Sequence, residues 1–297
     1  MDKVKAATKT ISDKVDDAHI TVEEKTLKYR EVVKLDHHRM AERNGAETPP
    51  AIVSIFADDS RIVSELLSIN QLIGIDMPFK ILAYTEPNSQ KASYAYTSAE
   101  FIRRRHDLKQ HDLTDYKKVI DDIVAQLPPD AISSTDYLTV NNGFGIIKIK
   151  SDYKFYLTLT KIREFVHDNQ TNRWFSQIDF QKDAMEYDIS VGPTMLCLFG
   201  VPEVGAEAMY DATKIGLEAF CQKVLVYEDT DGFVYVAFND ATKFGELYYG
   251  KTNKGQINVK TQMTVGLTNT VTNPEKYKKQ EANIVEIDNC LPKPFTI

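Results

Sequence analysis

The chain has 297 residues, with 36 Lys and Arg against 43 Asp and Glu, so its net charge is −7 when histidine is neutral. This acidic balance disfavours a general nucleic-acid binder, because such binding depends on Lys and Arg neutralising phosphates. The length allows about two domains at ~150 residues each, and 42% hydrophobic residues suffice for packed cores, which excludes disorder over most of the chain.

Signals for membrane insertion or export are missing from the sequence. No apolar run approaches the ~18 residues that a spanning helix needs, and the opening Met-Asp-Lys-Val-Lys stretch lacks the apolar core of a secretion signal. Cys197, Cys221 and Cys290 are scattered, form no C-x-x-C pair and fit a reducing compartment. We expect a soluble cytoplasmic protein with no membrane span, while export of a trimmed mature form stays open.

The first half of the chain predicts an alternation of helices and strands. Apolar residues at helical spacing mark the helices, and short apolar runs bounded by turn residues mark the strands. In chain order, the expected elements are a helix with the stripe Val4, Thr8, Ile11 and Val15, a strand over 28–35, a short helix, a strand ending at Phe56, a helix carrying Ile62, Leu66 and Ile69, a strand hairpin, a helix from Ser98, and a helix over 115–127 that ends at Pro128.

The second half repeats the first. A shift of 143 residues places 36–86 on 179–229 without a gap, and the apolar pattern of 52–56 agrees with that of 195–199. The helical stripe also recurs, at Phe155, Leu159, Ile162 and Val166. The identical pairs in the 143-residue register are Asp36/Asp179, Ala41/Ala184, Pro50/Pro193, Phe56/Phe199, Lys80/Lys223, Leu82/Leu225 and Tyr84/Tyr227.

Strands joined by hairpins are antiparallel, so the repeat predicts an α+β fold. We expect two related domains, each an antiparallel sheet packed with helices, arranged as a pseudo-dimer. The predicted divisions are 1–127 for the first repeat with a trailing helix, 128–136 for a linker, 137–255 for the second repeat, and 256–297 for a C-terminal extension.

The second repeat begins one element earlier than the first, with the alternating strand 146–150. The first repeat has no room for a counterpart, because its opening helix starts almost at Met1. Either preceding residues have been cut away, or another segment fills the place. The candidates are Tyr137–Val140 and Ile257–Val265, which have strand-like composition and would lie beside the strand around Val32.

Short motifs of the second repeat resemble the domain-of-unknown-function 302 family. That family has an I-D-H step, an alanine, a P-T-x-L-x-x-F-G-x-P strand and turn, and a K-V-L-V strand. Here 178–179 reads I-D, 193–202 reads P-T-M-L-C-L-F-G-V-P and 223–226 reads K-V-L-V. The first repeat keeps 35–37 as L-D-H but replaces the F-G-x-P turn. The resemblance implies a compact α+β domain that often self-associates and has no established activity.

Polar residues shared by the two repeats are candidates for a site. Lys80 and Tyr84 point to one face of their strand, and Lys223 and Tyr227 repeat the arrangement. Such a pair could line a cleft, with the ammonium binding an anion and the ring forming a wall. The alternative is an edge or surface strand whose Lys stem covers apolar area while its head reaches water, and Lys is seldom fully buried.

The Asp36-His37 step is the other candidate. An imidazole beside a carboxylate can act as acid or base near neutral pH. The second repeat has Asp179-Phe180 in its place, so chemistry that depends on histidine would belong to the first repeat only. The favoured alternative is that Asp36 and Asp179 cap the short helices that follow.

The Arg103-Arg104-Arg105-His106 run lies at the end of a predicted helix. Cations there complement the helix dipole. A solvated charged helix end is the favoured interpretation, and a local anion site is the alternative.

The sequence holds no G-x-S-x-G, H-E-x-x-H or Walker A motif, and it predicts neither a metal nor a cofactor. We therefore expect a non-catalytic binding or interaction protein, with a small-ligand site in or between the repeats. Its partner is an unknown small molecule or protein, with self-association left open. The alternative is an enzyme of unassigned reaction that uses Asp36, His37, Lys80 and Tyr84. The candidate ligand-binding residues are Asp36, His37, Lys80, Tyr84, Lys223 and Tyr227.

Overall fold

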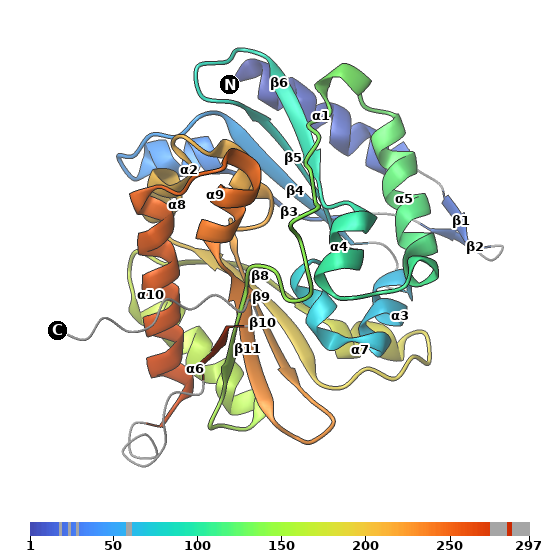
Figure 1. Cartoon of the computed structure of the whole chain (residues 1–297), viewed down its shortest axis with the longest axis vertical. Coiled ribbons are helices and arrows are strands. Elements are labelled where there is room, and N and C mark those ends of the chain that lie inside the picture. Colours follow the sequence, from blue (N-terminus) through green and yellow to red (C-terminus); the bar gives the residue numbers. More distant parts are fainter. Residues whose placement is uncertain (18–19, 23–24, 28–29, 58–60, 274–283, 287–297) are drawn as a thin grey trace.

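Two antiparallel sheets, one from each half of the chain, lie next to each other in the centre of the molecule (Figure 1). The computed structural model describes residues 1–17, 20–22, 25–27, 30–57, 61–273 and 284–286. The first sheet has the order β3-β4-β5-β6, and the second has the order β7-β11-β10-β9-β8 with β12 added beside β7. Their strands are β3 (Arg30–Asp36), β4 (Ala51–Ala57), β5 (Phe79–Thr85), β6 (Ala92–Tyr96), β7 (Ile146–Lys150), β8 (Arg173–Asp179), β9 (Thr194–Gly200), β10 (Gln222–Glu228), β11 (Val234–Asn239) and β12 (Ile284–Glu286).

Helices cover the outer faces of both sheets. In Figure 1, α5 lies at the right, beside the first sheet. Helix α10 lies at the left, beside the second sheet. No helix in the described ranges is both long and apolar enough to cross a bilayer. The helices are α1 (Asp2–Asp17), α2 (His37–Arg43), α3 (Arg61–Ile69), α4 (Ala99–Arg105), α5 (Thr114–Ala125), α6 (Phe155–Asp168), α7 (Phe180–Met185), α8 (Pro202–Met209), α9 (Ala241–Tyr249) and α10 (Lys254–Val271).

Four 3-10 helices and a short strand pair complete the fold. The pair of β1 (Ile20–Val22) and β2 (Lys25–Leu27) is separate from the two large sheets. The 3-10 helices are η1 (Gln71–Ile75), η2 (Gln110–Leu113), η3 (Pro129–Ala131) and η4 (Thr213–Leu217).

The element order of the first half recurs in the second, which confirms the predicted α+β fold of two related domains. Polar side chains begin the helices in both halves as the sequence predicts. Asp36 accepts from the backbone N–H of Arg39, and Asp179 accepts from that of Lys182. Ser98 and Asp240 cap α4 and α9 in the same way. The stripes of α1 and α6 are buried at Val4, Ile11, Leu159 and Ile162.

The two halves contact each other through reciprocal pairs of elements. Helix α2 of the first half packs on α8 of the second, and the matching helices α7 and α3 pack together likewise. The 3-10 helix of each half also lies on the other half's sheet, η1 against β10 and η4 against β5. Each half therefore buries the same surface against its neighbour.

The prediction of a replacement strand for the first sheet is wrong. Ile257–Val265 belongs to helix α10, and Tyr137–Val140 forms no strand. The place that corresponds to β7 is beside β6, not beside the strand around Val32. There Ile132 forms a single parallel bridge with Tyr94, and the Ser133 N–H donates to the Tyr94 carbonyl at 2.7 Å.

Candidate functional site

The two shared lysines meet where the halves join. Lys80 lies on β5 and Lys223 on β10, and both strands are central in their sheets. The lysines are 1% and 3% exposed. The alternative interpretation, an edge or surface strand whose lysine heads reach water, is therefore wrong. A buried ammonium is stable only when it is paired, so the partner must also lie inside the protein.

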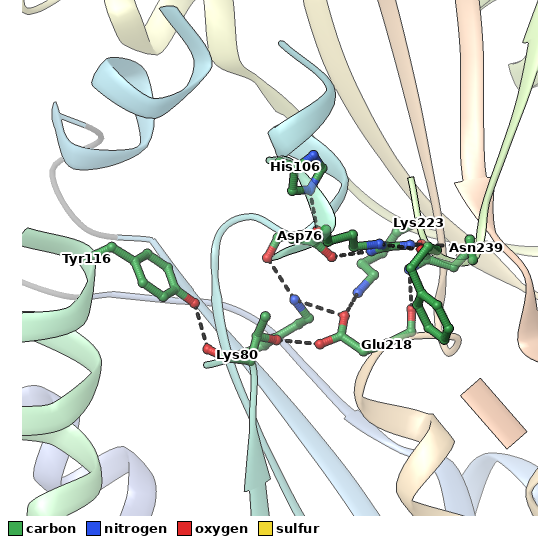
Figure 2. A network of polar contacts seen from close by, with 11 residues as sticks. Asp76, Lys80, His106, Tyr116, Glu218, Lys223 and Asn239 are labelled. Carbon is green, nitrogen blue, oxygen red and sulfur yellow. Dashed lines mark hydrogen bonds and ion pairs between the residues drawn. The ribbon is translucent and has the colours of Figure 1, made fainter. Parts of the chain in front are cut away.

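That partner is Glu218, which directly follows η4 in the second half. Its Oε2 atom lies 2.9 Å from the Lys223 Nζ atom and 3.2 Å from that of Lys80 (Figure 2). The other carboxylate oxygen accepts from the Thr97 hydroxyl at 2.5 Å. Glu218 is 1% exposed, so one buried carboxylate from the second half pairs directly with an ammonium from each half.

A second buried carboxylate, Asp76, directly follows η1 in the first half. It accepts from the Arg105 guanidinium at 2.5 Å, and its other oxygen lies 2.7 Å from the His106 Nε2 atom. Its backbone carbonyl accepts from Lys80 at 2.7 Å. The 3-10 helix of each half thus ends in a buried acid beside a buried base, and Lys80 connects the two clusters (Figure 2).

Arg105 extends this network across the junction. Its guanidinium donates to the Asn239 side-chain oxygen at 2.6 Å and to the Phe144 carbonyl at 2.7 Å. The rings of Phe101 and Phe244 lie 5.4 and 5.3 Å from the guanidinium carbon. Arg105 is fully buried and His106 is 5% exposed. The interpretation of the Arg103–His106 run as a solvated helix end is therefore wrong for its last two residues.

Burial and charge oppose each other in setting the protonation of the network. Burial alone would raise the pKa of Asp76 and of Glu218, but the neighbouring cations outweigh it and hold both values below their usual range. Burial lowers the pKa of Lys80 to about 8, although Glu218 opposes the shift. Burial also lowers the pKa of His106 against the effect of Asp76. At neutral pH, His106 is therefore uncharged and donates to Asp76 from Nε2.

The predicted tyrosines lie apart from the lysines that share their strands. Tyr84 is 1% exposed and interacts with Ser133 and Glu86, and burial raises its pKa. Tyr227 stacks on Tyr235 with ring centroids 5.5 Å apart. The structure thus brings Lys80 and Lys223 together and places each tyrosine in a separate contact.

Asp36 and His37 also lie apart from the network. Asp36 caps α2, whereas His37 faces a cavity of about 30 Å³ between α2 and α8. Burial lowers the His37 pKa to about 4, although Asp36 opposes the shift. The imidazole is therefore neutral at pH 7, and its Nε2 atom is buried without a hydrogen-bond partner in the described part of the chain.

A larger pocket of about 550 Å³ lies in the second half, among α6, α8, α10 and the turn that follows β9. Its lining is mainly apolar, with Phe165, Val204, Val259 and Met263 among the contributors. Within the described ranges, no charged side chain belongs to it. The volume lies within the ~300–1,000 Å³ typical of small-molecule sites. Sequence reasoning missed this pocket because helix α10 was predicted to be an extension with strand-like composition.

Metal-binding groups do not converge in the described residues, where no cluster of three or more His, Cys, Asp or Glu side chains could hold an ion. Cys197 and Cys221 are buried and unpaired thiols. The buried network contains acids and bases, but its side chains are shielded from solvent. We therefore interpret it as a structural contact between the halves.

Comparison with known proteins shows the family of the chain. A family model described as "Domain of unknown function DUF302" matches residues 7–127 and 147–264, well over half of the chain. The chain belongs to the DUF302 family. The two matches confirm the tandem repeat of the DUF302 domain that the sequence predicts.

A solved DUF302 structure is also similar to the chain. It is titled "Crystal structure of uncharacterized conserved protein DUF302 from Bacillus stearothermophilus", is 11% identical, and covers 43% of this chain and 95% of its own, with a TM-score of 0.36. No curated protein matches the sequence. The DUF302 domain has no assigned function, so the site must be interpreted from its own geometry.

The contact between the two DUF302 copies predicts unequal effects of two substitutions. Glu218→Gln leaves two buried lysines without their carboxylate and should lower the free energy of unfolding by about 3 to 5 kcal/mol. Lys80→Met keeps the Glu218–Lys223 pair and should cost less than about 2 kcal/mol. Urea unfolding measures both values.

A matched control for these two substitutions is Asp121→Asn, which breaks an exposed pair with Lys117. It should cost under about 1 kcal/mol. Equal losses for Glu218→Gln and the control would show that Glu218 does not stabilise the junction.

The buried His37 imidazole predicts a loss of stability in acid. The His37 pKa is about 4 in the folded protein, against the ordinary value of 6.5. Between pH 4 and pH 6.5, the unfolded chain therefore binds a proton that the folded protein does not. Stability therefore falls as pH drops below 6.5. This one group should cost about 3 kcal/mol by pH 4, and His37→Gln should remove that part of the pH dependence of urea unfolding.

His111→Gln is the control for the acid measurement, because the His111 side chain is 75% exposed. It should keep the pH dependence of the unchanged protein. Parallel curves for His37→Gln and the unchanged protein would contradict the buried neutral imidazole.

Proposed function

We propose that this DUF302 protein is a non-catalytic small-molecule binding protein and that the 550 Å³ pocket of the second copy is its site. The observation that carries the proposal is the pocket itself, which combines a volume suited to a small molecule with an apolar lining. The F-G-V-P turn at 199–202 contributes Phe199, Gly200 and Val201 to its wall. The motif by which the sequence resembles its family thus lies at the proposed site.

The two copies act in this proposal as one rigid pseudo-dimer. Support comes from the reciprocal packing of α2 on α8 and of α3 on α7, together with the buried ion pairs that cross the junction. Because that junction is filled by side chains, the ligand site lies beside it and not within it. The second copy carries the pocket, and the first copy supports it through α2.

The enzyme alternative gains no support from the positions of its residues. Asp36 is engaged in a helix cap and Lys80 in ion pairs, while Tyr84 contacts Ser133 and Glu86. His37 alone has a free polar atom, and it faces only the small cavity. No described contact joins any two of these four side chains as a catalytic pair would require.

Filling the pocket should abolish binding without unfolding the protein. The double substitution Gln222→Phe and Val259→Tyr places two aromatic rings in the pocket. The neutral dye N-phenyl-1-naphthylamine should bind the unchanged protein at a single site, with a fluorescence increase, and should bind the double variant at least tenfold more weakly.

Leu157→Phe, which enlarges a side chain that is 48% exposed on α6, is the control and should bind like the unchanged protein. Circular dichroism should be the same for all three proteins. Equal dye binding by the double variant and the control would place the dye elsewhere and overturn the proposal.

A further inference from the structure

The pocket contains a side chain whose hydrogen-bonding capacity is unused. Gln222, the first residue of β10, is 7% exposed and lines the pocket. Side chains alternate along a strand, so Gln222 faces the pocket while Lys223 faces the junction. The Gln222 carboxamide forms no hydrogen bond with another residue of the described part of the chain. Its amide atoms are therefore accessible from the pocket.

The first copy shows what the same place holds when no pocket is present. In the 143-residue register, Gln222 of β10 corresponds to Phe79 of β5. Phe79 and Tyr116 stack with ring centroids 4.7 Å apart. An aromatic ring that stacks on helix α5 in the first copy is thus replaced in the second by a carboxamide.

This replacement does two things at once. It opens space between the sheet and α10, and it brings a polar group into that space. A substitution that only opened space would leave the pocket dry and apolar. Here the carboxamide faces open space without a hydrogen bond from the described part of the chain, so its donor and its acceptor are both available to a ligand.

The remaining polar groups of the lining are also uncharged. They are the side chains of Asn169, Asn172, Thr261 and Gln262. An ionised ligand would lose its hydration without meeting an opposite charge, which is strongly unfavourable. A neutral ligand escapes this cost. A carboxamide both donates and accepts, so the group that satisfies it fully is another amide or a group with the same paired donor and acceptor.

We propose that the pocket binds a neutral molecule with an apolar body and an amide-like group that pairs with the Gln222 carboxamide. The inference rests on the proposed function, because it names the ligand class of the same pocket. It makes Gln222 the residue that determines specificity, with the apolar walls supplying affinity.

The test compares three probes that share one apolar tail: octanamide, octanoate and octylammonium. Dissociation constants are measured by NMR titration of the full chain at pH 7. Octanamide should bind at least tenfold more tightly than either ion. Gln222→Leu, which keeps the size of the side chain, should weaken octanamide about tenfold, as expected for the loss of one to two hydrogen bonds.

Gln110→Leu is the matched control, since Gln110 is exposed on η2 of the first copy and does not line the pocket. It should leave octanamide binding unchanged. The melting temperature of the ligand-free Gln222→Leu protein should stay level, because the carboxamide makes no hydrogen bond within the described part of the chain. That result would also show that weaker binding does not come from misfolding.

The outcomes separate the two proposals. The ligand class is wrong, and the binding function stands, if N-phenyl-1-naphthylamine binds in the pocket but octanamide shows no preference over the ions. The same holds if Gln222→Leu binds octanamide as well as Gln110→Leu does. If neither the dye nor octanamide perturbs residues of the pocket, both proposals fall.

Discussion

The ion pairs of Glu218 with Lys80 and Lys223 are the contact on which the rest of the structure depends. One carboxylate of the second copy lies between two ammonium groups, one from each copy, at distances of 3.2 and 2.9 Å. Loss of this carboxylate would leave both buried ammonium groups uncompensated, which is strongly destabilising. The contact therefore joins the two DUF302 copies into one unit and favours one position of each copy relative to the other.

This arrangement explains why the candidate site lies away from the centre. The shared lysines are the most obvious polar feature common to the copies, yet their ammonium groups are already satisfied. Divergence between the copies is more informative than identity. Where Phe79 stacks on Tyr116 in the first copy, the corresponding Gln222 faces the pocket in the second. The shared lysines thus belong to the junction, whereas Gln222, which differs between the copies, belongs to the pocket.

Much of the fold could be predicted from the sequence because periodicity and capping are local. The sequence alone predicts the apolar stripe of α6, the helix caps Asp36 and Asp179, and the 143-residue register. The site could not be predicted in this way, because it depends on contacts between residues far apart in the chain. Lys80 contacts Glu218 only when both sheets are in place. The signal in the sequence for this network was an acidic residue shortly before each shared lysine, Asp76 before Lys80 and Glu218 before Lys223. Helix α10 was missed because its threonines and valines favour strands locally, while packing on α8 and α6 decides otherwise.

The central claim is that Lys80 of the first copy and Glu218 of the second are directly coupled. A double-mutant cycle with Lys80→Met, Glu218→Gln and both together, measured by urea unfolding, tests it. We predict a coupling free energy of about 2 kcal/mol, within the range found for residues in one buried network. Additive effects within about 0.5 kcal/mol, the range found for distant sites, would contradict the account.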